Sequence, residues 1–235
     1  MLTLRHVVLF LFAMLSTAQS HVFAQRVKHS KEVIDAYRVC QQFQRLLAED
    51  LDFDRAFEAT FTKNQVRRRE IAISEGEFGP VDLDHVDDAT LIGAYKSRMQ
   101  ILYLMLTLAS PDSNEQEQEF FPPPIKAIFK RKGPERPEDF PSFSAQLKRD
   151  VADLRAHLNR LAVQDPAVAE RVRSFKSDLS RVPQLPKHKV EPLTAYSRGR
   201  VLDVKEKYYQ VGDYAVIREG AQMRIIGIRF FSRLF

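Results

Sequence analysis

The segment spanning residues 87–109 constrains the fold more than any other part of the chain. Asp87 or Asp88 can begin a helix there, because a carboxylate accepts hydrogen bonds from the free N–H groups of a first helical turn. The first half of the segment is amphipathic, whereas the second half, ILYLMLTLA, is apolar on every side. A helix of this kind must be covered by other helices, so the segment is predicted to form the centre of the fold.

Two helices are predicted before this central one. Apolar residues recur at three- and four-residue steps over residues 30–50, and Ser30 is a suitable N-cap. A shorter helix follows with a stripe of Phe53, Phe57 and Phe61, which we interpret as core rather than as a ligand pocket. Cys40 shares the buried face of the first helix, so we read it as a small hydrophobic residue and not as a nucleophile.

Two more helices are predicted after the central one. The apolar positions of residues 147–161 and 168–179 alternate steps of three and four. Asp165-Pro166 between them is a strong helix start, since proline fits the first helical position. The two segments are predicted to form an antiparallel hairpin that packs on the core.

Residues 111–142 interrupt this helical pattern. They contain seven of the 12 prolines, with one turn of helix predicted at residues 125–129. Proline fixes φ and removes a backbone donor, so the stretch is predicted to be a loop or an extended spacer. Two interpretations remain open, a surface linker and a strap that binds a partner.

The pattern changes to strands near the C-terminus. Turns at residues 211–213 and 219–221 separate β-rich runs at residues 200–211, 214–218 and 222–231. They predict a three-stranded antiparallel meander. The fold class is therefore α+β, a mainly helical body with a C-terminal meander.

The first residues have the order of a secretory signal peptide. Arg5 precedes an apolar run over residues 7–15, and small residues suit cleavage after Ala24, our preferred site, or after Ala18. As a helix, this run would rise about 14 Å against roughly 30 Å of hydrocarbon, too short for a membrane anchor. We expect an exported protein, periplasmic or secreted, that is not transmembrane after cleavage.

These observations divide the chain into five regions. They are a signal peptide at residues 1–24, an N-terminal helical region at 25–110, a Pro-rich linker or strap at 111–142, a helical hairpin at 143–180 and a basic β-meander at 181–235.

Positive charge is concentrated in the last of these regions. The whole chain carries +5, but residues 181–235 hold eleven Lys and Arg against five Asp and Glu, a net of +6. Such a surface attracts anionic partners, although cations along strands also serve to keep an edge soluble. Nucleic acid is disfavoured as a partner because export separates the protein from it. The candidate surface for an anionic or envelope partner comprises Lys187, Lys189, Arg198, Arg200, Lys205, Lys207, Arg218, Arg224 and Arg229.

The sequence contains only weak candidates for metal-binding or catalytic motifs. Asp50, Asp52 and Asp54 have the spacing of the first ligands in a calcium-binding loop. The later positions that need Gly and a bidentate acid hold other residues, so helix capping explains these carboxylates. The acidic residues around His85 could bind a divalent cation or could stabilise the start of the following helix. We expect no catalytic, cofactor or metal residues, since the glycine-rich loops and metal or nucleophile motifs of known enzymes are absent.

Two further groups of charged residues lie between positions 67 and 77. Glu75 and Glu77 would share a face if residues 71–78 form a strand, which would give paired carboxylates. The three arginines at positions 67–69 are expected to solvate a helix end.

Both ends of the chain resemble one known superfamily. The closing GDYAVIREGAQMRIIGIRFF is similar to the last hairpin of the nuclear-transport-factor-2-like (cystatin-like) superfamily, and VCQQFQRLLAEDLDFDRAFEATF is similar to its first helix and turn. The resemblance implies helices packed on a curved antiparallel sheet around a pocket, in a superfamily that hosts enzymes and binding proteins alike.

Two functions remain open at this point, beside a purely structural role. The first is a non-enzymatic exported binding or envelope-associated protein that uses the basic sheet or an apolar pocket beneath it. The alternative is a small-molecule enzyme on a cone-like fold, with a polar group in an apolar pocket formed by Tyr208, Tyr209, Tyr214 and the last strand.

Overall fold

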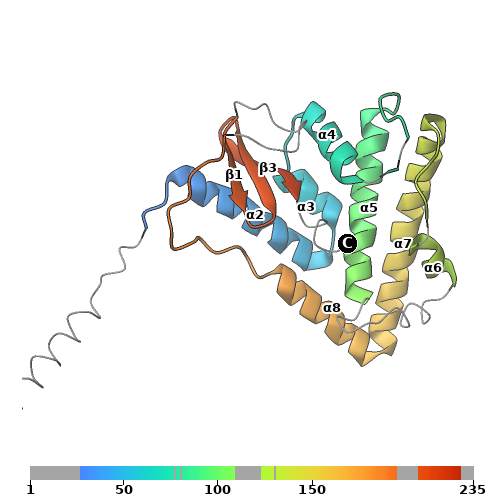
Figure 1. Ribbon diagram of the computed structural model, residues 1–235. Helices are drawn as coiled ribbons and strands as arrows, with labels where there is room; N and C mark the ends of the chain where they lie inside the picture. The colour runs from blue at the N-terminus through green and yellow to red at the C-terminus, as the bar shows by residue number, and fades with distance from the viewer. Residues whose placement is uncertain are drawn as a thin grey trace, which may run out of the picture.

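The structure, a computed structural model, describes residues 27–76, 78–79, 81–108, 123–129, 131–194 and 206–228. It confirms the α+β class, with a mainly helical body and a C-terminal three-stranded antiparallel sheet (Figure 1). The predicted signal peptide lies outside the described residues. The elements are α2 (Lys31–Asp50), α3 (Phe53–Thr60), α4 (Gln65–Gly76), α5 (Asp88–Leu108), α6 (Pro123–Phe129), the 3₁₀ turn η2 (Pro137–Asp139), α7 (Phe140–Gln164), α8 (Pro166–Leu179), β1 (Tyr208–Val211), β2 (Tyr214–Glu219) and β3 (Gln222–Ile228).

Helix α5 is the centre of the helical body, as its apolar pattern predicts. Its start is capped by Asp87, whose Oδ1 accepts a hydrogen bond from the Thr90 N–H at 2.9 Å. The helix is in contact with α3, α4, α7 and α8, which cover it on several sides. None of the described helices is both long and apolar enough to cross a bilayer.

Helices α5 and α7 lie side by side and run in the same direction (Figure 1). Their first turns meet where the Ser144 hydroxyl donates to the Thr90 carbonyl at 3.4 Å. Parallel neighbours cannot be joined by a tight turn, so the chain must return along their full length. This requirement gives a physical reason for the long Pro-rich stretch between the two helices.

The described part of the Pro-rich stretch packs against the body. Ile125 and Ile128 of α6 are buried. Arg131 forms a two-pronged ion pair with Asp150 of α7, with distances of 2.6 and 3.0 Å from its Nε and Nη2. At Gly133 an added Cβ would lie 2.2 Å from the Phe78 carbonyl oxygen, so only glycine fits this close approach. Residues 111–122 and residue 130 of the stretch lie outside the described part of the chain.

Helix α4 corrects two sequence expectations. Residues 71–76 belong to this helix and not to a strand. The three arginines of its first turns do not merely solvate a helix end, since Arg68 is only 7% exposed. Arg67 pairs with Glu206, Arg68 with Glu58 and Arg69 with Asp88. The three side chains tie α4 to three different parts of the fold.

The sheet has the order β1-β2-β3 and packs on α2. A bulge at Ala215 and Val216 shifts the register with β3, so that Ile225 opposes Val216 while Gly227 opposes Ala215. The extra residue in β3 breaks simple alternation of its side chains. Phe61 adds a parallel bridge to Ile225 at the open edge of β3.

An aromatic core joins the sheet to the helices. Phe53 is fully buried, and its ring lies about 6 Å from those of Phe43, Tyr95 and Tyr103. Tyr214 of β2 contacts Phe43 edge to face at 5.6 Å. Edge-to-face packing of this kind adds to the burial of apolar area. The predicted phenylalanine stripe is therefore core.

Candidate functional site

A cleft of about 730 Å³ opens between α3, α5 and α7, with the start of α4 at one end. Its apolar lining includes Ala89, Ile92 and Val151. Its size is within the range of small-molecule sites, and a few charged groups on partly apolar walls are typical of such sites. The charged residues that line it are Asp52, Asp54, Glu58, Arg68, Asp88, Lys96, Lys148 and Arg155.

Helix α3 supplies acidic residues to one wall of the cleft. Asp54 and Glu58 are four residues apart, so they lie on the same face of the helix. Asp52 caps the helix, with its Oδ1 accepting from the Arg55 N–H at 3.1 Å. The opposite face of α3 carries the core phenylalanines, and the amphipathic pattern of this helix therefore orients the carboxylates toward the cleft.

Glu58 is the hub of the ion pairs in the cleft. Its carboxylate accepts hydrogen bonds from Arg68 at 3.0 and 3.2 Å and from the Lys96 ammonium at 3.2 Å. Lys96 also contacts Asp54 at 2.5 Å. Burial raises the pKa of Glu58, but its hydrogen bonds to Arg68 and Lys96 outweigh this effect and lower the pKa to about 2. The carboxylate is therefore ionised at neutral pH.

Phe57 forms the back of this charged wall. The Arg68 guanidinium lies 5.0 Å from the centre of its ring, and the Lys96 ammonium lies 5.9 Å from it. Cations at these distances are attracted to the negative face of an aromatic ring. Arg68 also donates through Nε to the Thr62 carbonyl at 2.6 Å, which further fixes its position.

Helix α7 supplies the opposite wall, and its cations have different partners. Lys148, Val151 and Arg155 are spaced by three and four residues and share one face of the helix. Arg155 donates to the backbone carbonyls of Asp50 and Leu51 at 3.4 and 3.3 Å. Neither cation forms an ion pair with a carboxylate of the described residues.

Gln100 closes the cleft near the start of α3. It is 5% exposed, and its Oε1 accepts from the Phe53 N–H at 2.6 Å while its amide donates to the Leu51 carbonyl. Leu51 has a left-handed backbone with φ of 56°, which ends α2 and turns the chain into α3. One buried amide thus fixes the loop on which Asp52 is carried.

The predicted basic surface is only partly within the described residues. Arg198, Arg200, Lys205 and Arg229 lie outside them. Of the remaining members, Lys189 pairs with Glu191 at 2.5 Å and Arg218 pairs with Glu32 at 2.7 Å.

The other described members of this basic surface are Arg224, Lys187 and Lys207. Arg224 donates to the Ala59 carbonyl at 2.7 Å. Lys187 and Lys207 form no ion pair among the described residues. The hydrogen bonds from Tyr209 and Arg218 lower the pKa of Glu32, and the charge of Lys207 acts in the same direction as the smallest contribution. An anionic partner for this surface stays a prediction.

The three predicted pocket tyrosines lie on two faces of the sheet. Tyr209 opposes Val216 and Val211 opposes Tyr214, which places Tyr209 and Tyr214 on the same face, whereas the neighbouring Tyr208 points the other way. Tyr209 donates to Glu32 of α2 at 2.7 Å, and burial together with this hydrogen bond raises the pKa of Tyr209 to about 12. The enzyme hypothesis that used these residues stays a prediction.

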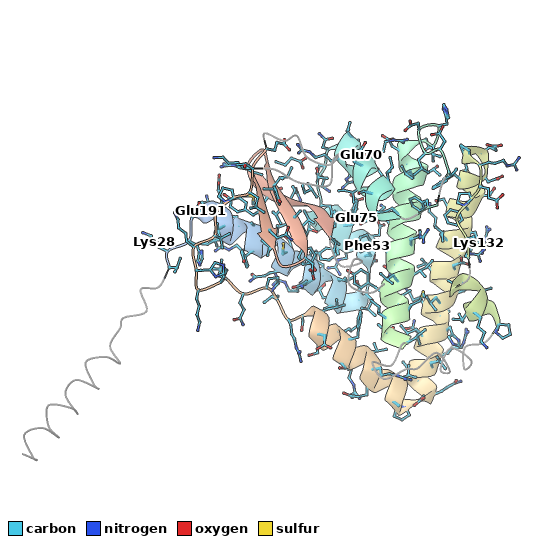
Figure 2. The ribbon with its side chains drawn as sticks, in the orientation of Figure 1. Lys28, Phe53, Glu70, Glu75, Lys132 and Glu191 are labelled. Carbon is cyan, nitrogen blue, oxygen red and sulfur yellow. The ribbon has the colours of Figure 1, made fainter. Side chains whose placement is uncertain are left out.

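The acidic candidates of the sequence have structural partners. Glu75 accepts from the Tyr95 hydroxyl at 3.0 Å and from the Ile228 N–H at 2.8 Å, so it links α4, α5 and β3. In Figure 2, Glu75 and Phe53 lie in the interior between the sheet and α5, whereas Lys28 and Lys132 lie at the periphery. Glu77 lies outside the described residues. Within the described ranges, no three His, Cys, Asp or Glu side chains are grouped so that they could hold a metal ion.

The cleft itself was not predicted. Its charged residues come from segments as far apart as Asp52 and Arg155, and only the tertiary fold brings them together. The signals that the sequence did contain are the charged steps of four on α3 and the spacing of Lys148, Val151 and Arg155 on α7. Such charged faces are usually solvated, so neither indicated a site on its own.

Comparison with models of protein families, with curated proteins and with solved structures found no match to this chain. The resemblance of its two ends to the nuclear-transport-factor-2-like superfamily therefore stays a prediction.

Proposed function

We propose that the protein is an exported, non-enzymatic binding protein that holds a small polar solute in the cleft between α3, α5 and α7. The observation that carries this proposal is the charged cleft of about 730 Å³, whose Glu58, Arg68 and Lys96 are held in place by one another. Preorganised groups of this kind bind a solute at a smaller cost in side-chain entropy than mobile ones do.

The state of the charged groups favours binding over catalysis. The pKa of Glu58 is about 2, so this carboxylate is a poor general acid or base near neutral pH. Lys96 lies between two carboxylates, with its ammonium 2.5 Å from Asp54 and 3.2 Å from Glu58, so it is already engaged in two ion pairs within the protein. The cations and anions of this wall are suited to hold charges rather than to transfer protons.

The signal-like order of residues 1–24 supports export. Cys40, which is buried on α2, is consistent with an oxidising compartment because burial raises the pKa of its thiol. A buried, protonated thiol of this kind reacts slowly.

A thermal-shift screen of the protein beginning at Gln25 tests the proposal. The panel comprises amino acids, mono- and dicarboxylates, sugars, inorganic phosphate and polyamines. We expect at least one class to raise the Tm with a saturating dependence on concentration, because a ligand that binds only the folded state stabilises it.

Two tryptophan variants show whether the ligand occupies the cleft. Ala89→Trp places a large ring at the cleft wall, whereas Ala152→Trp adds the same ring on an exposed position of α7 outside the cleft. We expect Ala89→Trp to abolish the Tm shift and Ala152→Trp to retain it. A panel with no stabilising compound, or a shift that both variants retain, would contradict the proposal.

A further inference from the structure

We infer that the solute bound in the cleft is an α-amino acid with an anionic side chain, a molecule with two negative groups and one positive group. This inference rests on the proposed function and names the class of ligand. It follows from which charges of the cleft are already paired within the protein and which are not.

Three of the four acids in the cleft are neutralised by neighbouring cations. Glu58 pairs with Arg68 and Lys96, and Asp54 pairs with Lys96. Asp88 pairs with Arg69 of α4 at 2.7 Å. The charges of these three acids, of Arg68 and of Lys96 are thus compensated within the protein, so this part of the cleft offers a ligand little net charge.

Three charged side chains of the cleft have no ion-pair partner among the described residues: Lys148, Arg155 and Asp52. Arg155 uses two of its nitrogens on backbone carbonyls, and Asp52 uses Oδ1 to cap α3. Their sum is one net positive charge, so the complementary ligand has a net charge of minus one. A ligand that left any of the three unpaired would have to remove it from water without compensation.

The positions of these groups match the head of an α-amino acid at one end of the cleft. Arg155 bonds to the carbonyl of Leu51, the residue directly before Asp52. A guanidinium suits a carboxylate and a neighbouring aspartate suits an ammonium group, so Arg155 and Asp52 can take the two charges of the head.

Lys148 is two helical turns from Arg155 and takes the second anionic group. Seven residues of α-helix span about 10 Å between Cα atoms, and flexible stems on both side chains shorten the gap that the ligand must bridge. Val151 lies between the two cations, and Ile92 of α5 lines the same cleft. The middle of the ligand is therefore a short apolar chain.

Isothermal titration of the protein with L-glutamate, L-2-aminoadipate and L-2-aminopimelate tests this inference. We expect at least one of the three to bind with a Kd below about 1 mM. L-glutamine lacks the second anion and glutarate lacks the ammonium group, and each is expected to bind at least about tenfold more weakly than L-glutamate. If a longer acid is the tightest ligand, its own amide and its own analogue without the ammonium group are expected to bind at least about tenfold more weakly than that acid.

Substitutions then assign the contacts. Lys148→Gln is expected to weaken the acidic amino acid about tenfold or more without changing the affinity for its amide analogue, and Asp52→Asn is expected to remove the preference for the ligand with an ammonium group. Arg149→Gln, one residue along α7 and outside the cleft lining, is the control and should bind like the parent protein.

The outcomes separate this inference from the proposed function. The inference is overturned, and the proposed function stands, if another class of solute binds and Ala89→Trp blocks it, or if Lys148→Gln leaves the affinity for the acidic amino acid unchanged. Both fail together if no compound of either panel binds.

Discussion

The two sides of helix α3 face different environments, since one side packs in the core and the other side lines the cleft. One side carries Phe53 into a closed aromatic core, where its ring meets those of Phe43 and Tyr95. The other side carries Asp54 and Glu58 into an open cleft of ion pairs. Phe57 belongs to both, since it stacks on Phe61 at 4.5 Å and also lies beneath Arg68 and Lys96.

This difference separates what stabilises the fold from what is available to a ligand. The core gains free energy from burying apolar area, and nothing in it is left to bind. In the cleft, ion pairs that are partly exposed add little stability, but they hold charges in fixed positions. Lys148 and Arg155, which lack such pairs, are the groups whose loss should affect binding and leave the fold intact.

The largest expected effect is in the core. Phe53→Ala should lower the free energy of unfolding by about 3–5 kcal/mol, because it removes a fully buried ring and leaves a cavity among its neighbours. Val163→Ala, at a position that is 88% exposed, should change it by less than about 0.5 kcal/mol. Urea unfolding followed by circular dichroism measures both. Equal effects would mean that the aromatic cluster is not the core.

The second-largest loss in the free energy of unfolding is expected on breaking a buried ion pair outside the cleft. Arg131→Met should cost about 3 kcal/mol, because it leaves the Asp150 carboxylate, 3% exposed, without its cation. Arg149→Met, on the exposed side of α7, the helix that carries Asp150, is the matched control and should be nearly neutral. If the two variants unfold at the same urea concentration, the Pro-rich stretch is not fixed to α7 by this pair.

The Glu58 ion pairs predict a smaller effect that depends on pH. The pKa of Glu58 is lowered from 4.5 to about 2 in the folded protein, so the unfolded chain takes up the proton first as pH falls. The stabilisation is present above about 4.5 and is lost as pH falls toward about 2. Glu58→Gln should therefore be less stable than the parent at pH 7 and should show a smaller decrease in stability between pH 5 and pH 3, measured by urea unfolding. Parallel pH profiles would contradict the assignment.

The smallest expected effect on stability is at the unpaired cation of α7. Lys148→Gln should change the free energy of unfolding by no more than about 0.5 kcal/mol, because the side chain is exposed and forms no ion pair with a described residue. Urea unfolding of this variant beside Arg149→Gln provides the measurement. A large loss would show that Lys148 serves the fold and not a ligand.

The sequence predicted the elements better than the site. Apolar spacing and capping residues located α2, α5 and the three strands, because these signals are local: Ser30 accepts from the Val33 N–H, and Gly212 and Gly220 occupy the two turns with positive φ. Helix α4 was not predicted, since its arginines look like a solvated charge run until their partners on distant segments are known. The cleft was missed for the same reason, because Glu58, Lys96 and Lys148 line one cleft only in the folded chain.

The most direct test of the central claim is to map binding onto the two regions by NMR. The isotope-labelled protein beginning at Gln25 is titrated with the tightest ligand of the screen while backbone amide shifts are followed. The account predicts saturable shifts at Gly93, Lys96 and Val151, which line the cleft, and none at Gly212 in the turn of the sheet. Shifts confined to the sheet, with the cleft amides unmoved, would contradict it.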